Sequence, residues 1–358
     1  MFDYYRNFAW PVVRLLDPET AHTLAVRALK SGVVPPSCRF DDAALRTTVW
    51  GREFPNPVGL AAGFDKNAEI PDAMLAQGFG FTEIGTVTPR SQPGNARPRM
   101  FRLVEDRALV NRMGFNNEGL DAVATRLQAR PRRGIVGANL GKNKDTEDAA
   151  ADYETGAARL APLSDYLVIN VSSPNTPGLR ALQGRDQLAA LVTRTRAALD
   201  GAVPQGTRPP LLLKIAPDLA WEDLDDIAAV ALAGMLDGLI VSNTTIARPK
   251  WLRSPHARET GGLSGAPLFE PSTAMLRRMY ELTDGKLPLV GAGGIGSGSE
   301  AYAKIRAGAS LVQFYSAMVY EGPGLVGRIN RELCGLLKRD GFTAIAQAVG
   351  ADHRHEAA

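Results

Sequence analysis

Polar residues at the ends of short apolar runs suit this sequence to binding a planar, anionic ligand. Lys66 and Asn170 each stand at the end of such a run, and Lys214 lies inside the run Leu211–Ala216. Amide side chains pair with ligands rich in carbonyl and N–H groups, and a lysine supplies a cation for an anionic group. A cation in so apolar a run needs a partner, so Lys214 is a candidate binding-site residue.

A glycine-rich run near the C-terminus indicates where a phosphate group would bind. Gly293 and Gly294 end one apolar run and lead into a helical segment, and Tyr315 and Ser316 end the next run. Glycines by themselves are equally typical of turns. A glycine-rich strand end that opens a helix, followed by the loop of the next strand, is however the usual phosphate site of α/β barrels. We therefore expect these four residues to anchor a phosphate.

The strands that precede these residues must position them. From about residue 45, apolar runs without polar alternation are separated by helical segments, which indicates strands buried on both faces of a parallel sheet. Eight such strands predict a (β/α)8 TIM barrel with its site at the C-terminal strand ends. The competing doubly wound sheet usually opens on a GxGxxG turn, which does not follow the first run. Small hairpins are expected at 45–56 and 97–115. The eight runs are Pro57–Gly63, Phe81–Thr88, Gly134–Gly141, Tyr166–Ser173, Leu211–Ala216, Gly238–Asn243, Leu289–Gly294 and Leu311–Ser316.

Residues 1–40 depart from this repeat and predict a short N-terminal helical extension, which leaves 41–358 for the barrel. Two helices are expected, the second with Asp17 as its N-cap and Pro18 at its first position. The expected apolar face of this second helix comprises Ala21, Leu24, Ala25, Ala28 and Leu29. The aromatic, mildly basic start of the extension suits either a cap packed on a soluble domain or an element that lies on a membrane.

Composition excludes several classes of protein. The chain has 358 residues, 45% of them hydrophobic and 22% charged, which is ordinary for a globular protein. No apolar run approaches the roughly 18 residues that span a bilayer, and no signal peptide is recognisable. A net charge of +3 without a basic block argues against a nucleic-acid partner. Cys38 and Cys334 form no CxxC pair and only four histidines are present, so we expect no disulfide scaffold and no metal site.

Several long motifs resemble the dihydroorotate dehydrogenase family. The run Asn170–Arg180, NVSSPNTPGLR, looks like the signature of the family, and Asn111–Asn117, Gly261–Gly265 and Leu311–Ser316 support it. The motifs occur in the expected order over nearly the whole chain. The N-terminal extension is similar to that of the membrane-associated, quinone-reducing class, whereas the soluble classes lack the extension and carry a cysteine where Ser173 stands.

The resemblance implies oxidation of (S)-dihydroorotate to orotate on FMN, in de novo pyrimidine synthesis. Ser173 would be the catalytic base that takes the C5 proton while a hydride passes from C6 to the flavin, and Thr176 would assist the proton relay. By similarity, FMN would be held by Ala62, Gly63, Phe64, Asp65, Lys66, Thr86, Asn139, Asn170, Lys214, Ser242, Gly265, Gly294, Tyr315 and Ser316. The substrate would contact Lys66, Asn111, Arg112, Met113, Gly114, Phe115, Asn170, Asn175, Asn243 and Thr244.

The resemblance also gives the extension a role. Its helices would form a tunnel for a quinone, ubiquinone or menaquinone, with His22, Arg102 and Tyr315 at the head-group end. The implied protein is a monomer, peripheral on the cytoplasmic side of the inner membrane. Two alternatives stay open. One is a soluble dihydroorotate dehydrogenase that uses fumarate or NAD. The other is a non-catalytic flavin-binding barrel, against which the set of Lys66, Ser173 and Lys214 argues.

Overall fold

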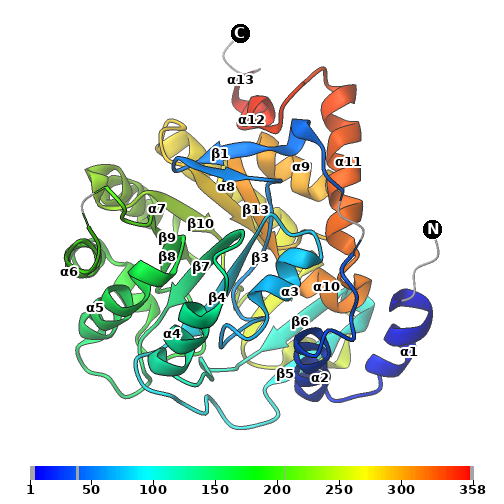
Figure 1. The fold of residues 1–358 in the computed structure, drawn as a ribbon, viewed down its shortest axis with the longest axis horizontal. Coiled ribbons are helices and arrows are strands. Elements are labelled where there is room, and N and C mark those ends of the chain that lie inside the picture. The colour runs from blue at the N-terminus through cyan, green and yellow to red at the C-terminus, as the bar shows by residue number, and fades with distance from the viewer. Residues whose placement is uncertain (1–4, 38–39, 205, 355–358) are drawn as a thin grey trace.

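Eight apolar runs of the sequence form parallel strands that close into a barrel (Figure 1). The computed structural model describes residues 5–37, 40–204 and 206–354. The order around the barrel is β10-β12-β13-β3-β4-β7-β8-β9, and β9 pairs with β10 to complete the ring. This confirms the (β/α)8 prediction and rules out the doubly wound sheet. The strands are β3 (Val58–Leu60), β4 (Phe81–Val87), β7 (Ile135–Leu140), β8 (Tyr166–Asn170), β9 (Leu211–Ile215), β10 (Gly238–Val241), β12 (Leu289–Ala292) and β13 (Ala309–Phe314).

A β-hairpin covers the N-terminal end of the barrel. Its strands are β1 (Thr47–Val49) and β2 (Arg52–Phe54). This confirms the hairpin expected at 45–56. Phe54 packs edge-on against Phe81 of β4, with ring centroids 5.4 Å apart. Gly137 lies so close to the ring of Tyr166 that a Cβ there would be 2.0 Å from it. Large rings therefore fill this end of the barrel where small neighbours admit them.

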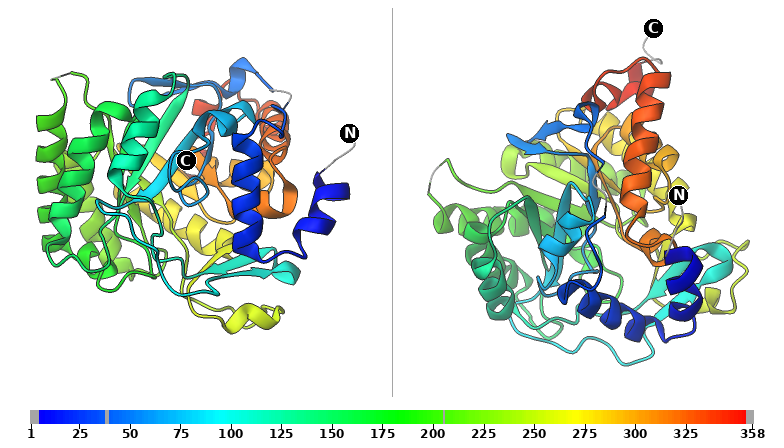
Figure 2. Two further views of the ribbon diagram at one scale, coloured as in Figure 1. Left: turned by 60° about the horizontal axis from the view of Figure 1, so that its bottom comes forward. Right: turned by 45° about the vertical axis from the view of Figure 1, so that its right-hand side comes forward.

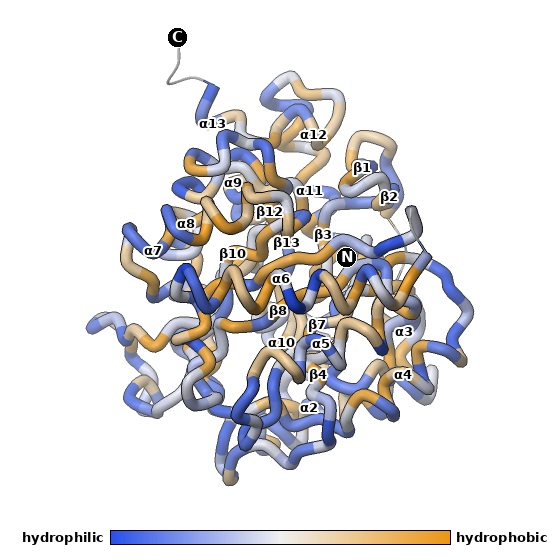
Figure 3. The backbone as a smooth tube through the Cα atoms, turned by 90° about the vertical axis from the view of Figure 1, so that its left-hand side faces the viewer, coloured by the Kyte–Doolittle hydropathy of each residue, from blue (hydrophilic) through white to orange (hydrophobic). Residues whose placement is uncertain are grey.

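Helices alternate with the barrel strands and cover the outside of the barrel. Hydrophobic residues are concentrated along the strands that these helices enclose (Figure 3). In α6, for example, Leu188, Leu191, Val192 and Leu199 are buried at helical spacing. The helices are α3 (Pro71–Ala76), α4 (Leu120–Ala129), α5 (Ala149–Leu160), α6 (Arg185–Ala202), α7 (Trp221–Val230), α8 (Phe269–Leu282), α9 (Gly298–Arg306), α10 (Ser316–Glu321), α11 (Leu325–Arg339), α12 (Ile345–Ala348) and α13 (Ala351–Arg354).

A small antiparallel sheet stands beside the barrel. It consists of β5 (Met100–Leu103), β6 (Ala108–Asn111) and β11 (Gly262–Gly265), in the order β11-β6-β5. The first two strands confirm the hairpin expected at 97–115. The third strand was not predicted, because GLSG is too short and too rich in glycine to show strand periodicity. Its pairing partner β6 lies about 150 residues earlier in the chain, so only the tertiary structure brings the two together.

The N-terminal extension lies against the small sheet and α10 (Figure 2). It comprises a π-helical turn η1 (Tyr5–Ala9), α1 (Trp10–Val13) and α2 (Pro18–Lys30). Asp17 caps α2 as expected, and its carboxylate accepts hydrogen bonds from two backbone N–H groups of the first turn. Ala21 and Leu29 are buried, but Leu24 and Ala25 are exposed. The expected apolar face is therefore only partly covered, because α2 rests on its neighbours along a narrow stripe.

A buried ion pair fastens α2 to the segment before β5. The guanidinium of Arg99 donates hydrogen bonds to both carboxylate oxygens of Glu19, at 2.7 and 3.1 Å, and both side chains are almost fully buried. Arg97 adds a third hydrogen bond, at 2.9 Å, from the solvent side. Burial would raise the pKa of Glu19, but the hydrogen bonds and charges of the two arginines outweigh it and hold that pKa below its usual value. Glu19 is therefore ionised at neutral pH, and its ion pair holds α2 against the segment before β5.

Glu19→Gln should lower the free energy of unfolding by about 3 kcal/mol at pH 7, because Arg99 is then buried without an anion. In the control Arg97→Ala, the lost guanidinium is 71% exposed, so we expect less than about 1 kcal/mol. Guanidinium unfolding followed by circular dichroism measures both. Since the pKa of Glu19 is lowered by folding, the difference between wild type and Glu19→Gln shrinks as the pH falls through that pKa. Equal losses of unfolding free energy in the two variants would contradict the buried, stabilising ion pair of Glu19 and Arg99.

Candidate active site

A cavity of about 740 Å³ lies at the C-terminal ends of the barrel strands and extends to β6 and β11 of the small sheet. Parallel strands present these ends at one rim, so side chains far apart in the sequence converge there. The volume is typical of small-molecule and cofactor sites. Of the predicted residues, the cavity is lined by Ala62, Gly63, Lys66, Thr86, Asn111, Met113, Gly114, Phe115, Asn170, Ser173, Asn175, Lys214, Ser242, Asn243, Thr244, Gly265, Gly294, Tyr315 and Ser316.

A buried charge pair lies at the floor of the cavity. Lys214 Nζ is 3.9 Å from Glu83 Oε1, and both side chains are almost inaccessible to solvent. The same carboxylate accepts hydrogen bonds from Asn139 Nδ2 and Gln313 Nε2, each at 2.8 Å. Tyr166 OH donates to it at 3.2 Å. Lys214 thus has the partner that its apolar run required. Glu83 was not among the predicted residues, and its one signal in the sequence is that it is the only charged residue of β4.

Amide and hydroxyl groups continue this pair toward the cavity wall. Asn139 Oδ1 accepts hydrogen bonds from Thr86 Oγ1 at 2.6 Å and from Asn170 Nδ2 at 3.1 Å. Asn170 Oδ1 in turn accepts from Ser172 Oγ at 2.9 Å and Asn243 Nδ2 at 3.4 Å. Asn139 itself does not line the cavity; it lies behind the wall and orients Thr86 and Asn170. Connected hydrogen bonds in a buried site fix the direction in which each amide points.

The loop after β8 places Ser173 in the cavity wall. Ser173 is buried, and its Oγ accepts a hydrogen bond from the backbone N–H of Asn175 at 3.2 Å. The Asn175 side chain donates to the carbonyl oxygen of Asn111 at 3.1 Å, which ties the loop to the small sheet. Further along, Arg180 donates to the carbonyl oxygen of Thr244 at 3.0 Å, which ties the loop to the segment after β10. The loop that carries Ser173 is therefore held on two sides.

The N-terminal extension reaches this region through His22. Its imidazole lies between Lys66 Nζ and the hydroxyl of Tyr315, 3.4 Å from each. Burial, and then the charge of Lys66, lower the pKa of His22 well below its usual value, so the ring is neutral at pH 7. Burial also lowers the pKa of Lys66 to about 8. Within the described ranges no carboxylate forms an ion pair with Lys66, so an anionic ligand would supply the missing partner.

Arg102 completes the group predicted for the quinone. It stands on β5 and donates a hydrogen bond to the carbonyl oxygen of Leu16 at 2.7 Å, which holds the turn that precedes α2. Burial raises the pKa of the Tyr315 hydroxyl, and the positive charge of Arg102 offsets this only in part. Its Nε is buried and has no hydrogen-bond partner among the described residues. The structure therefore brings His22, Arg102 and Tyr315 to one region between the extension and the barrel.

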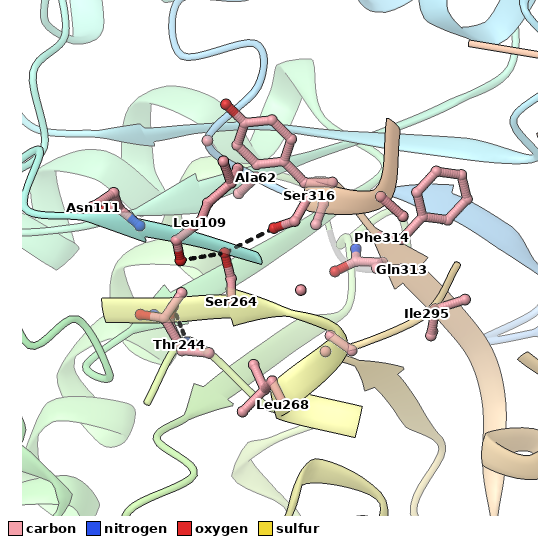
Figure 4. A pocket seen from close by; sticks show the side chains of 18 of the residues that line it. Ala62, Leu109, Asn111, Thr244, Ser264, Leu268, Ile295, Gln313, Phe314 and Ser316 are labelled. Carbon is pink, nitrogen blue, oxygen red and sulfur yellow. Dashed lines mark hydrogen bonds between the residues drawn. The ribbon is translucent and has the colours of Figure 1, made fainter. Parts of the chain in front are cut away.

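The glycine-rich end of the cavity leaves backbone exposed to a ligand. Gly293 and Gly294 both have positive φ, and a Cβ on Gly294 would lie 2.4 Å from the backbone of Phe269. Ser316, which also lines the cavity, donates from its Oγ to Ser264 Oγ at 2.8 Å, and the two side chains point toward each other (Figure 4). Ser264 was not among the predicted residues, because the sequence of its strand β11 shows no strand periodicity. Bare backbone and hydroxyl groups of this kind suit an anion.

Besides Asn139, three of the residues predicted to contact FMN or the substrate do not line the cavity. Phe64 is buried and packs edge-on against His22, with ring centroids 5.1 Å apart. Asp65 accepts hydrogen bonds at 2.8 and 2.9 Å from two backbone N–H groups of the following turn, so it shapes the loop after β3. Arg112 pairs with the Glu259 carboxylate at 2.8 Å, beside a second, smaller cavity. Phe64 and Asp65 thus lie in the layer behind the cavity wall, whereas Arg112 lines the second cavity.

Comparison with known proteins decides the family. The model of the dihydroorotate dehydrogenase family matches residues 44–337. This chain belongs to that family. The dihydroorotate dehydrogenase (quinone) of Rhodospirillum rubrum is 65% identical over 355 residues, which cover 99% of this chain and 96% of that protein. The mitochondrial dihydroorotate dehydrogenase (quinone) of Arabidopsis thaliana is 55% identical over 372 residues, covering 96% and 81%. The crystal structure of the Eimeria tenella dihydroorotate dehydrogenase in complex with ferulenol matches with a TM-score of 0.91 and 46% identity, covering 94% and 96%.

Dihydroorotate dehydrogenases are flavoenzymes, which agrees with a cavity lined by amides, glycines and two lysines. In the described part of the chain, no group of three or more His, Cys, Asp or Glu residues is arranged to hold a metal ion. Cys334 is buried and free, and Cys38 lies outside the described residues.

The buried pair at the cavity floor can be tested by a double-mutant cycle. Glu83→Gln and Lys214→Met should each lower the free energy of unfolding by about 3 kcal/mol, because each leaves one buried charge without its partner. The double variant should lose at least about 1 kcal/mol less than the two losses added together, because it contains neither charge. Denaturant unfolding of the four proteins measures the cycle. Additive losses would mean that the two charges do not interact.

Proposed function

We propose that this protein oxidises (S)-dihydroorotate to orotate, with FMN as hydride acceptor and a membrane quinone as final electron acceptor. The observation that carries the proposal is the convergence of Lys66, Ser173 and Lys214 on one cavity of a chain in this family. The base position holds a serine, and an N-terminal extension contacts the same cavity through His22. Both features favour the quinone-linked class over the soluble enzymes that use fumarate or NAD.

The cavity residues fit FMN by the chemistry of their donors. Bound there, FMN would supply the hydride acceptor. Lys214 offers a cation beside the amides of the cavity floor, where it would favour negative charge on a reduced flavin ring. The backbone of Gly265 and Gly294, with the Ser316 hydroxyl, offers a phosphate cradle. Gln313 Oε1 is buried without a partner among the described residues, so the cavity floor still has an acceptor to satisfy.

Ser173 is proposed as the base that takes the proton from C5 of dihydroorotate. A serine hydroxyl is a poor base at its free pKa, so the site must help it. Burial of Ser173 excludes water, and the N–H of Asn175 orients its Oγ. Thr176 Oγ1 is buried and has no hydrogen-bond partner among the described residues, so it is available to relay a proton. Burial and orientation of Ser173 support a serine base, and we propose the hydroxyl of Thr176, three residues along the chain, as its proton outlet.

Lys66 is proposed to hold the carboxylate of the substrate. Its buried ammonium has no ion-pair partner in the described ranges, and an anionic substrate would restore the pKa that burial has lowered to about 8. Asn111, Asn175 and Asn243 would orient the ring by pairing with its carbonyl and N–H groups. Hydrogen bonds within the protein hold all three of these amides in place. Such preorganisation is what makes a site effective in catalysis.

The quinone head group is proposed to bind where the extension meets the barrel, next to His22, Arg102 and Tyr315. His22 is neutral there, so it can both donate to and accept from a quinone oxygen. We assign residues 1–40 to this quinone and membrane-facing extension and 41–358 to the catalytic barrel, and we propose a monomer.

Exposed apolar side chains on the extension support a peripheral position on a membrane, and we propose the cytoplasmic side of the inner membrane. Phe8, Val12 and Leu15 are 62%, 62% and 80% exposed. Among the described residues, no helix is both long enough and apolar enough to cross a bilayer. An amphipathic element that lies in the interface would bury these side chains among lipid head groups.

The proposed activity is tested by reducing the purified flavoprotein with dihydroorotate and offering each acceptor in turn. We expect a quinone to reoxidise the flavin rapidly, and fumarate or NAD to do so slowly. Ser173→Ala should keep its flavin but slow the reductive step by at least about 100-fold, the usual contribution of a general base. Ser173→Cys is the matched variant, and its rate should rise with pH as the thiol ionises. Fast turnover with fumarate or NAD and none with a quinone would assign the chain to a soluble class.

Membrane association is tested by co-sedimentation with anionic phospholipid vesicles. Leu15→Ser should reduce the fraction bound about tenfold or more, because burying a leucine side chain contributes roughly 1.5–3 kcal/mol. Leu232→Ser is the control, because Leu232 is also exposed but lies after α7, on the barrel. Equal binding of the two variants would show that the extension does not contact the lipid.

A further inference from the structure

A buried lysine that has no role in the proposed reaction lies behind the glycine-rich end of the cavity. Lys304, on α9, is completely buried. Its Nζ donates hydrogen bonds to Ser272 Oγ at 2.8 Å and Thr273 Oγ1 at 2.9 Å, and it lies 5.2 Å from the centre of the Phe269 ring. These three neighbours are all on α8, and none of them carries a negative charge.

A buried ammonium surrounded by neutral groups is costly unless an anion compensates it. In the described part of the chain, no carboxylate forms an ion pair with Lys304. Burial lowers the pKa of Lys304 to about 7, and the more distant carboxylates of Glu270 and Glu300 offset this only in part. A hydrophobic side chain would fill the same space without this cost. The surrounding protein therefore supplies no close anion to stabilise the charged form of Lys304, and an anion nearby would favour that form.

The cavity offers a place for such a partner close to Lys304. Ser272 Oγ, which accepts the hydrogen bond from Lys304, lies 3.2 Å from the carbonyl oxygen of Gly293. Gly293 and Gly294 form the cavity wall at this point. The stem of Lys304 also packs against the strand that leads into this wall, because a Cβ on Gly291 would lie 3.2 Å from it. The Ser272 hydroxyl and the backbone of Gly293 thus separate the Lys304 ammonium from the cavity.

We propose that Lys304 is a positioning residue for the phosphate group of the bound mononucleotide. From behind the Gly293–Gly294 wall, its positive charge favours an anion on the exposed backbone, and it makes the site prefer a phosphorylated flavin to an unphosphorylated one. The proposal rests on the proposed flavin site. If Lys304 had a purely structural role, its replacement would instead affect the binding of every flavin equally.

The test compares FMN with riboflavin, which has the same ring system but no phosphate. The full-length chain is freed of flavin and titrated with each compound, and quenching of flavin fluorescence gives the two dissociation constants. Lys304→Met should weaken FMN binding at least about tenfold and change riboflavin binding by less than about twofold. Lys304→Arg, which keeps the charge, should restore the preference for FMN. Lys286→Met, which removes an exposed lysine, is the control and should change neither constant.

The possible outcomes separate the proposals. Equal weakening of FMN and riboflavin, or unchanged FMN binding, would overturn the role of Lys304 while leaving the flavin site intact. Failure of the wild-type chain to bind either flavin would instead overturn the proposed function. If Lys304→Met does not fold, as judged by circular dichroism, Lys304→Gln carries the same expectation, because it is neutral but can still hydrogen bond to both hydroxyl groups.

Discussion

The buried charge pair of Glu83 and Lys214 is the constraint on which the site depends. A closed barrel packed with side chains has no water near its axis, so a lone carboxylate there would be strongly destabilising. The cost of burying Glu83 is offset because donor groups surround its carboxylate. They belong to Lys214, Asn139, Gln313 and Tyr166. Those donors are in turn fixed in position. The charge pair thereby orients the amides and the cation that form the cavity floor.

The same principle connects the N-terminal extension to the barrel. Glu19 on α2 is held by the buried guanidinium of Arg99, and three residues further along the helix His22 lies against Lys66. A helix of 13 residues is marginal alone, so these contacts decide where it rests. The extension reaches the cavity at one face while its exposed apolar side chains stay on the other. One short segment thereby carries both exposed apolar side chains and a contact with the polar site.

Much of this arrangement could be predicted from the sequence. Apolar runs predicted all eight barrel strands, and their polar ends predicted most of the cavity, because the ends of parallel strands always share one rim. Glu83 is the one charged residue of its strand, but its role was missed because its partners come from strands distant in the sequence. Lys304 was missed for a similar reason, as a lysine on a helix is usually solvated. Strand β11 was missed because its four residues acquire strand geometry only by pairing with β6.

The sequence by itself thus determined the barrel, the residues at its strand ends and, through long motifs, the family. Periodicity and strand-end chemistry are local properties, and a single chain displays them. Only the tertiary structure decided which side chains form the supporting layer: that Asn139, Asp65 and Phe64 stand behind the wall, and that a lysine of α9 lies behind the glycine-rich loop. Burial and charge compensation depend on neighbours that are distant in the chain, and only folding brings these neighbours together.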